Sequence, residues 1–185
     1  PPQAWGKGFA PSRFRGLTQI GDEMPCNVMA DEILTPGEGQ IRALFCVGGN
    51  PIVAFPNQEK IKRAMDDLDL LVAIDPWMSA TSRRADYILG PVVALEREDA
   101  TLLGEMYFEE PYAHYTDKVV EPEGDTLEEW EFFWELAKRM NITLDINGAQ
   151  VDSKVKPSKF EITELATRGS RIPLQEVREK TEANG

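Results

Sequence analysis

Cysteine and histidine are scarce in this sequence, which holds two cysteines and one histidine. Two cysteines are too few for a disulfide framework, and Cys26 and Cys46 form no CxxC pair. We therefore expect no zinc or iron–sulfur site within this stretch of chain. The single histidine, His114, has no nucleophile elbow to serve, so a structural role is favoured over a catalytic one.

Basic residues are also in short supply, with 20 Lys and Arg against 32 Asp and Glu, a net charge of −12. Such an excess of carboxylates repels phosphate backbones, so we expect no nucleic-acid partner. One bound nucleotide is not excluded, because the backbone N–H groups of a turn can hold phosphates.

Long apolar runs are missing as well, and none approaches the roughly 20 residues that span a bilayer. The composition, 42% hydrophobic and 28% charged, is ordinary for a soluble globular protein, so we expect no membrane span. The sequence has no initiator methionine and no signal-peptide pattern. We expect it to be an excised piece of a longer protein.

The strongest pattern in the chain lies in residues 41–90. Three short apolar runs, at 41–47, 70–74 and 87–89, are separated by polar segments. Such runs are typical of strands buried on both faces of a parallel sheet. The segment after Asn57, a candidate N-cap, has apolar residues at helical spacing: Ile61, Ala64, Met65 and Leu68. The sequence therefore predicts an α/β fold, a Rossmann-like three-layer α/β/α arrangement with a mostly parallel sheet.

The first apolar run ends in the turn Gly48-Gly49-Asn50-Pro51. Two glycines permit positive φ angles and a close approach by a ligand. In open α/β sheets, ligands bind beyond the carboxyl ends of the strands, where this turn is expected to lie. A tight strand-to-helix turn that binds nothing fits the local pattern equally well.

Several polar residues follow the second apolar run. Asp75, before Pro76, occupies the place where dinucleotide-binding folds put an acid that accepts from a ribose or a base, although Asp is also common in turns. Ser79 and Thr81 are candidates for phosphate contacts or for helix caps. Asp86, at the start of the third run, is more typical of a cap than of a ligand contact.

Three segments together resemble one known family: IRALFCVGGNP (41–51), LDLLVAIDPWMSATSRRADYILG (68–90) and LEREDATLL (95–103). The family is the molybdopterin oxidoreductases, the large catalytic subunits typified by dimethyl sulfoxide reductase, formate dehydrogenase and periplasmic nitrate reductase. The sequence departs from the family pattern after the third run, where the family has Leu-Pro and this chain has Leu89-Gly90-Pro91. The shared elements are Gly49-Asn50-Pro51, Asp75-Pro76, the polar cluster 79–82, Ala85-Asp86 and Glu96.

The resemblance implies a cofactor, molybdopterin guanine dinucleotide, in its bis form with molybdenum. This region would be the second of two dinucleotide-fold domains and would hold the guanosine end of one dinucleotide. By position, Gly49 and Asn50 would line the nucleotide loop, Asp75 would meet the guanine or ribose, and Ser79 or Thr81 would lie near the phosphates. No catalytic or metal-ligating residue is expected. The candidate cofactor-binding residues are Gly48, Gly49, Asn50, Pro51, Asp75, Pro76, Ser79, Thr81 and Asp86.

The family's iron–sulfur cysteine cluster, metal-ligand segment and carboxy-terminal barrel-like domain have no counterpart here. The resemblance thus implies one domain of a larger subunit, with no redox activity and no tightly bound cofactor of its own. Its partners would be the remaining domains, with an iron–sulfur electron-transfer subunit as a further candidate. Cytoplasm and periplasm both stay open, because an export signal would lie on residues outside this sequence.

Two other functions remain open. One is a small α/β module that binds NAD or a free nucleotide, against which the absence of a complete GxGxxG counts. The other is a non-catalytic scaffold whose glycine-rich turn is only a turn.

The sequence as a whole suggests three segments. Residues 1–36 read as an irregular lead-in packed on the domain, 37–146 as the dinucleotide-fold domain, and 147–185 as a linker with short helices. An apolar stripe predicts a helix up to Met140, capped by Asp125 or by Thr126 in a capping box with Glu129.

Overall fold

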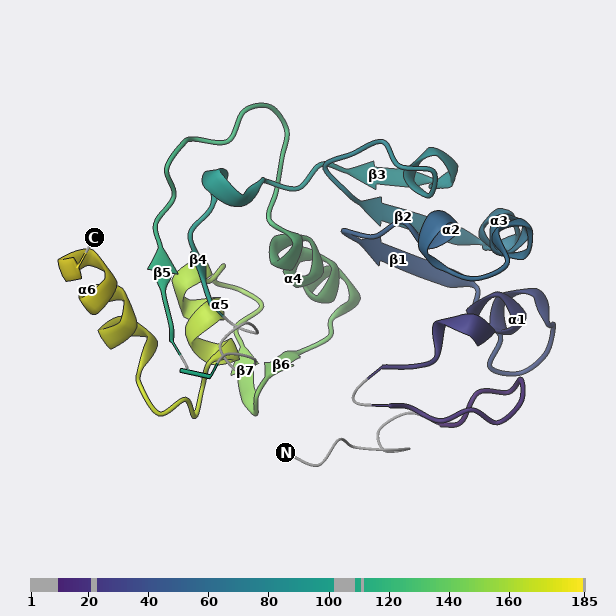
Figure 1. The fold of residues 1–185 in the computed structure, drawn as a ribbon, viewed down its shortest axis with the longest axis horizontal. Helices are drawn as coiled ribbons and strands as arrows, with labels where there is room; N and C mark the ends of the chain where they lie inside the picture. The colour runs from purple at the N-terminus through teal and green to yellow at the C-terminus, as the bar shows by residue number, and fades with distance from the viewer. Residues whose placement is uncertain (1–9, 21–22, 102–108, 111, 185) are drawn as a thin grey trace. The chain divides into compact units, whose positions relative to one another are not determined.

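The computed structural model describes residues 10–20, 23–101, 109–110 and 112–184 (Figure 1). The chain divides into two compact units, residues 1–90 and 91–185, each of which is described by itself. The segment boundaries expected after residues 36 and 146 stay a prediction. Residues 1–9 of the lead-in and 102–103 of the family-like segments lie outside the described part.

The first unit is built on a parallel sheet of β1 (Ala43–Val47), β2 (Leu70–Ile74) and β3 (Tyr87–Leu89), in that order (Figure 1). The register pairs Val47 with Ile74 and Ile74 with Leu89, so the strands end level with one another. The strands lie within the three predicted apolar runs, the first of which begins two residues before β1. This confirms the predicted α/β class with a parallel sheet, whereas the three-layer Rossmann-like arrangement stays a prediction. The predicted burial on both faces describes β2 but was wrong for β1 and β3, whose Phe45, Val47, Tyr87 and Ile88 are exposed, because these two are the edge strands of the sheet.

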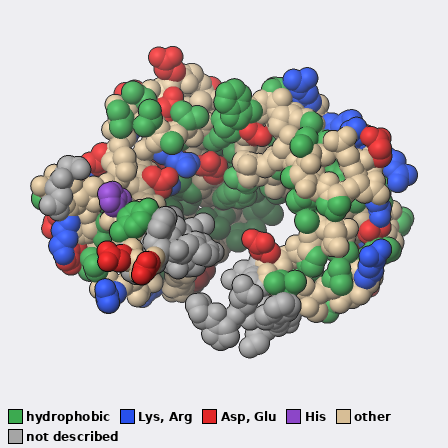
Figure 2. Space-filling view, in the orientation of Figure 1, with side chains coloured by type: hydrophobic (Ala, Val, Ile, Leu, Met, Phe, Trp, Pro, Cys, Tyr) green, Lys and Arg blue, Asp and Glu red, His purple; other side chains and the backbone are tan. Residues whose placement is uncertain are grey.

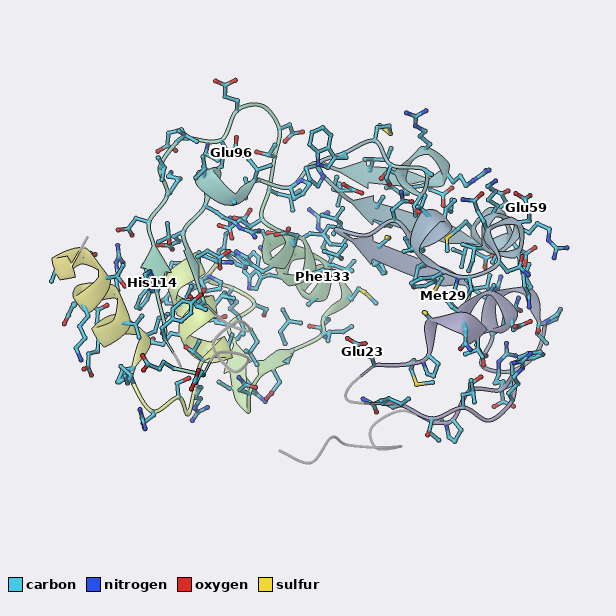
Figure 3. All side chains as sticks on the ribbon, viewed as in Figure 1. Glu23, Met29, Glu59, Glu96, His114 and Phe133 are labelled. Carbon is cyan, nitrogen blue, oxygen red and sulfur yellow. The ribbon has the colours of Figure 1, made fainter. Side chains whose placement is uncertain are left out.

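Helix α3 (Gln58–Asp67) begins where the sequence predicts. The Asn57 side-chain Oδ1 accepts a hydrogen bond from the Lys60 N–H (3.2 Å), which satisfies one free donor of the first turn. Charged side chains lie on the outer face: Figure 2 shows Lys and Arg over α3, and Figure 3 shows Glu59 there. The inner face contributes to the core of the unit, which comprises Ala30, Ile33, Ile52, Ile61, Ala64, Met65 and Leu71. Burial of each large member stabilises the fold by about 1.5 to 3 kcal/mol.

Within the lead-in, a buried carboxylate ties residues 12–14 to the short helix α1 (Met29–Leu34), which follows the 3₁₀ turn η1 (Cys26–Val28). Glu32 accepts hydrogen bonds from the Ser12 hydroxyl (2.6 Å), the Arg13 Nε (2.8 Å) and the Phe14 N–H (3.1 Å). Burial alone raises the pKa of Glu32, but these donors outweigh it and hold the pKa below its usual value. Residues 12–14 are therefore held against helix α1 through the charged side chain of Glu32.

The second unit combines small antiparallel pairs with helices (Figure 1). Strands β4 (Asp99–Ala100) and β5 (Tyr115–Thr116) form one pair, after the 3₁₀ turn η3 (Ala94–Glu96). The second pair, β6 (Leu144–Ile146) and β7 (Ala149–Val151), is a hairpin. Its turn is Asn147-Gly148, with positive φ at both residues as a two-residue hairpin requires. The helices are α4 (Glu129–Met140), α5 (Lys159–Ala166) and α6 (Leu174–Asn184).

The predicted cap of α4 was wrong, because the helix begins at Glu129 and its N-cap is Glu128. The capping box joins Glu128 to Glu131, whose side chain accepts from the Glu128 N–H (3.0 Å). The cause is a tertiary contact: Leu127 forms a bridge to Pro91, and its carbonyl accepts from the Val92 N–H (3.0 Å). This pairing holds the backbone before Glu128 extended.

His114 has structural contacts in the second unit. The backbone N–H of His114, labelled in Figure 3, donates to the Thr101 hydroxyl (3.2 Å). The His114 ring contacts the Tyr112 ring edge-on, with 5.5 Å between the ring centroids. Within the described ranges, no helix is both long enough and apolar enough to cross a lipid bilayer.

Candidate functional site

Polar and glycine residues gather where β1 and β2 end. The Gly48 N–H donates to the Ile74 carbonyl (2.8 Å), and the Asp75 N–H donates to the Leu89 carbonyl (3.2 Å). The backbone therefore continues the sheet pairing one residue beyond the strands. Gly48 and Asp75 lie on adjacent backbone segments, which a sheet spaces about 4.8 Å apart. This strand-end edge is the place where parallel sheets bind ligands.

A buried hydroxyl links the two strand ends. The Thr81 side chain is 0% exposed, and its hydroxyl donates to the Asn50 Oδ1 (2.9 Å). The Thr81 hydroxyl oxygen also accepts from the Ile52 N–H (3.3 Å) in the helix α2 (Pro51–Ala54). Thr81 thus holds the Asn50 side chain in one orientation, and Pro51 occupies the first position of the helix that follows.

The loop after β2 is held by a second network. Asp75 Oδ1 accepts from the Trp77 N–H (2.9 Å), which closes an Asx turn across Pro76. The Trp77 carbonyl accepts from the Ser79 N–H (2.8 Å) and from the Ser82 hydroxyl (3.3 Å). The hydroxyls of Ser79 and Ser82 share a hydrogen bond of 2.8 Å at the start of the 3₁₀ turn η2 (Ser82–Arg84).

The glycine turn has room and unused donors. Gly48 has a φ of +60°, and a Cβ added there would project into open space with no heavy atom within 4 Å. A Cβ at Gly49 would meet the Cys46 Sγ at 3.6 Å. Among the described residues, no oxygen accepts from the Gly49 or Asn50 N–H groups, and the backbone of Gly49 bonds to the Cys46 sulfur, a weak acceptor. The turn can therefore receive oxygen atoms of a ligand without displacing a bond to another oxygen.

Of the nine sequence-predicted residues, the structure brings eight together at the strand-end edge and leaves Asp86 apart. Asp86 precedes β3, at the opposite end of the sheet. Its Oδ2 accepts from the Leu71 N–H (2.7 Å), and its own N–H donates to the Leu71 carbonyl (2.8 Å). These bonds fasten the amino ends of β2 and β3, which is a structural task.

A family model described as molybdopterin oxidoreductase matches residues 21–139, which is well over half of the chain. This chain belongs to the molybdopterin oxidoreductase family. The match includes every residue of the strand-end edge, so the resemblance seen in the sequence is confirmed.

Three relatives resemble the chain over a limited part of their own length. The probable oxidoreductase YyaE of Bacillus subtilis is 33% identical over 140 residues, 73% of this chain and 20% of that protein. The F420-dependent formate dehydrogenase subunit alpha of Methanocaldococcus jannaschii is 29% identical over 138 residues, 71% of this chain and 20% of that one. A solved structure of acetylene hydratase from Pelobacter acetylenicus gives a TM-score of 0.59 at 26% identity, covering 66% of this chain and 16% of that chain. The chain thus spans a fifth or less of these relatives.

Two further residues of the strand-end loop, Trp77 and Ser82, were not among the nine candidates, although Ser82 belongs to the polar cluster 79–82. Trp77 is 78% exposed, and Ser82 is 1% exposed. A large aromatic residue directly after Asp-Pro, at a predicted strand end, is the signal that would have found Trp77, because loops at that edge carry ligand contacts. The polar cluster 79–82 includes Ser82, but its contacts with the Trp77 carbonyl and the Ser79 hydroxyl depend on the fold of the loop.

A cavity of about 430 Å³ lies apart from this edge, in the second unit. Its carboxylates already have partners: Glu98 accepts from the Tyr115 hydroxyl, Glu128 pairs with Lys159 (3.2 Å), and Glu131 pairs with Lys156. In the described part of the chain, no group of three or more His, Cys, Asp or Glu side chains could hold a metal ion. The strand-end edge is therefore the better candidate site.

The two cysteines differ in predicted reactivity. Burial and the nearby Asp75 carboxylate raise the pKa of the Cys46 thiol, and a backbone hydrogen bond of Gly49 opposes the rise only in part. Cys26 is exposed. Because the thiolate is the reactive form, we expect iodoacetamide at pH 8 to label Cys46 about ten-fold more slowly than Cys26. Mass spectrometry of timed digests measures both rates, and in urea the two cysteines should react alike; equal rates in the native chain would contradict the burial of Cys46.

Proposed function

We propose that this chain is the domain of a molybdenum-dependent catalytic subunit that holds the guanosine end of a molybdopterin guanine dinucleotide. The observation that carries the proposal is the conjunction, at one sheet edge, of a carboxylate and a glycine turn with unused N–H donors. The family match supports a pterin cofactor in the parent protein. The guanine dinucleotide, in its bis form, is the cofactor that the family resemblance implies, and we propose that its guanosine end binds at the strand-end edge.

Asp75 is the residue that would select guanine. Its Oδ1 is engaged by the Trp77 N–H, while its Oδ2 has no donor among the described residues. A guanine base presents an N1–H and an N2 amine side by side, and a carboxylate can accept from both donors. Adenine has no such pair, so the carboxylate would favour guanine.

The glycine turn would hold the ribose-phosphate portion. The N–H groups of Gly49 and Asn50 supply donors without adding positive charge, which suits a chain of net charge −12. Ser79 lies in the adjoining loop as a further hydroxyl. Thr81 would act indirectly, since its hydroxyl is committed to Asn50. Asp86 is omitted from the proposed contacts, because its carboxylate is bound to the Leu71 backbone.

In the parent protein, the molybdenum–pterin group would supply the redox chemistry, while this domain positions one end of it. The chain by itself would have no redox activity and only a weak hold on the cofactor. The remaining domains of the subunit would complete the binding site. An iron–sulfur electron-transfer subunit is a further proposed partner, in keeping with a relative that is itself named as a subunit alpha.

Calorimetric titration with GDP, GMP and NAD tests this function. We expect saturable binding of GDP and GMP in preference to NAD, and about 10- to 150-fold weaker GDP binding in Asp75→Ala, since a hydrogen bond to a charged group contributes about 1.5 to 3 kcal/mol. The matched control is Asp67→Ala, which removes an exposed carboxylate at the end of α3 and should leave affinity unchanged.

Each alternative function gives its own result in the same titration. Tighter binding of NAD than of GDP would favour a NAD-binding module. An absence of saturable binding for every nucleotide would favour a scaffold whose glycine turn has only a structural role. Equal affinities of wild type and Asp75→Ala would remove Asp75 from the site.

A further inference from the structure

The most exposed aromatic side chain in the described part of the chain lies at the strand-end edge. Trp77 is 78% exposed, two residues beyond Asp75. Indole is among the largest apolar side chains, and leaving it in water forgoes a substantial burial free energy. Neither the core of the first unit nor the sheet pairing uses it.

The backbone that carries this indole is held on both sides. The Trp77 N–H donates to Asp75 Oδ1 (2.9 Å), and its carbonyl accepts from the Ser79 N–H (2.8 Å) and the Ser82 hydroxyl (3.3 Å). Ser82 is itself buried and anchors the loop to the body of the unit. The indole is therefore presented to solvent from a fixed backbone. Little backbone conformational entropy remains to be lost when a ligand packs on it.

We propose that Trp77 is the stacking platform for the nucleobase whose edge meets Asp75. The inference rests on the proposed function and names a second determinant of the same site. The Asx turn brings the Asp75 carboxylate back to the Trp77 amide, so the carboxylate and the indole start from adjoining points of one loop. A flat base can then meet the carboxylate with its edge and the indole with its face.

The two side chains would divide recognition between them. Stacking on an aromatic ring accepts every base, because each base has a π face, and it contributes most to affinity for large purines. Hydrogen bonding to a carboxylate depends on the donors at the base edge. Trp77 would thus set affinity for purines in general, and Asp75 would set the preference for guanine.

The test compares variants of the full 185-residue chain by calorimetry with GDP, ADP and inorganic pyrophosphate. We expect Trp77→Leu to weaken GDP and ADP by about ten-fold each and to leave pyrophosphate unchanged, because only the base is stacked. Trp77→Phe should retain most of the affinity. The matched control is Tyr87→Leu, which removes another exposed aromatic side chain (64%) of the first unit, at the amino end of β3.

Tryptophan fluorescence gives an independent measure. GDP should quench the emission of the wild-type chain, and the quench should vanish in Trp77→Phe although that variant still binds. Circular dichroism and the pyrophosphate titration report whether each variant is folded.

The outcomes separate this inference from the function on which it rests. One outcome is that the wild-type chain binds GDP, that Asp75→Ala weakens this binding and that Trp77→Leu does not. This outcome would overturn the stacking role alone and assign the indole to packing against the parent protein. Absence of GDP binding by the wild-type chain would overturn both proposals. A purine-wide loss in Trp77→Leu, with the guanine preference kept, supports the stacking role.

Discussion

Replacing Thr81 with valine should destabilise the first unit by about 2 to 3 kcal/mol. The substitution keeps the shape of the side chain but leaves two groups, the Asn50 Oδ1 and the Ile52 N–H, without their buried partner. Unpaired buried polar groups cost about 1 to 3 kcal/mol each, and water can reach the glycine turn to relieve part of that cost. Amide hydrogen exchange of β2 measures the loss for this unit alone.

Thr81→Ser provides the matched control for that substitution. Serine keeps the hydroxyl and loses one methyl group, so it should cost about 1 kcal/mol and retain GDP binding. Because Thr81 orients Asn50, Thr81→Val should also weaken GDP binding, at temperatures where the unit remains folded. Equal effects of valine and serine would contradict the special contribution of the hydroxyl, because only valine removes it.

Replacing Glu32 with glutamine should cost about 2 to 3 kcal/mol at pH 7. Glutamine cannot supply the charge that the Arg13 guanidinium faces, and its NH2 group must face either the Arg13 Nε or the donors of Ser12 and Phe14. The exposed Glu38 of the same unit gives the control, since Glu38→Gln should change stability by less than about 0.5 kcal/mol.

The pH dependence of the Glu32 effect has a definite sign. The pKa of Glu32 is lowered in the folded chain from a usual value of 4.5. Its contribution is therefore present in full above pH 4.5 and is lost as the pH falls through the folded-state pKa. Hydrogen exchange at several pH values should show wild type and Glu32→Gln converging in stability below pH 4.5. A difference that stays constant down to pH 3 would contradict the ionised form of this contact.

The sheet of the first unit could be predicted because its signals are local. Apolar runs of three to seven residues between polar segments correspond to β1, β2 and β3, and one asparagine at the right offset predicted the cap of α3. The start of α4 was misjudged because a pairing with Leu127 competes with the local capping pattern. The strands β6 and β7 could not be predicted, since strands of three residues are too short for a periodic signal.

The sequence by itself determined the α/β class, the family and the strand-end position of the glycine turn and Asp75. These follow from periodicity and from short motifs, which are properties of neighbouring residues. Only the tertiary structure decided which polar groups are engaged. It commits Thr81 to Asn50, 31 residues away, commits Asp86 to the amino end of β2, and exposes Trp77 from a held loop. Contacts between distant residues depend on the register of the strands, because the register sets which side chains of neighbouring strands and loops meet.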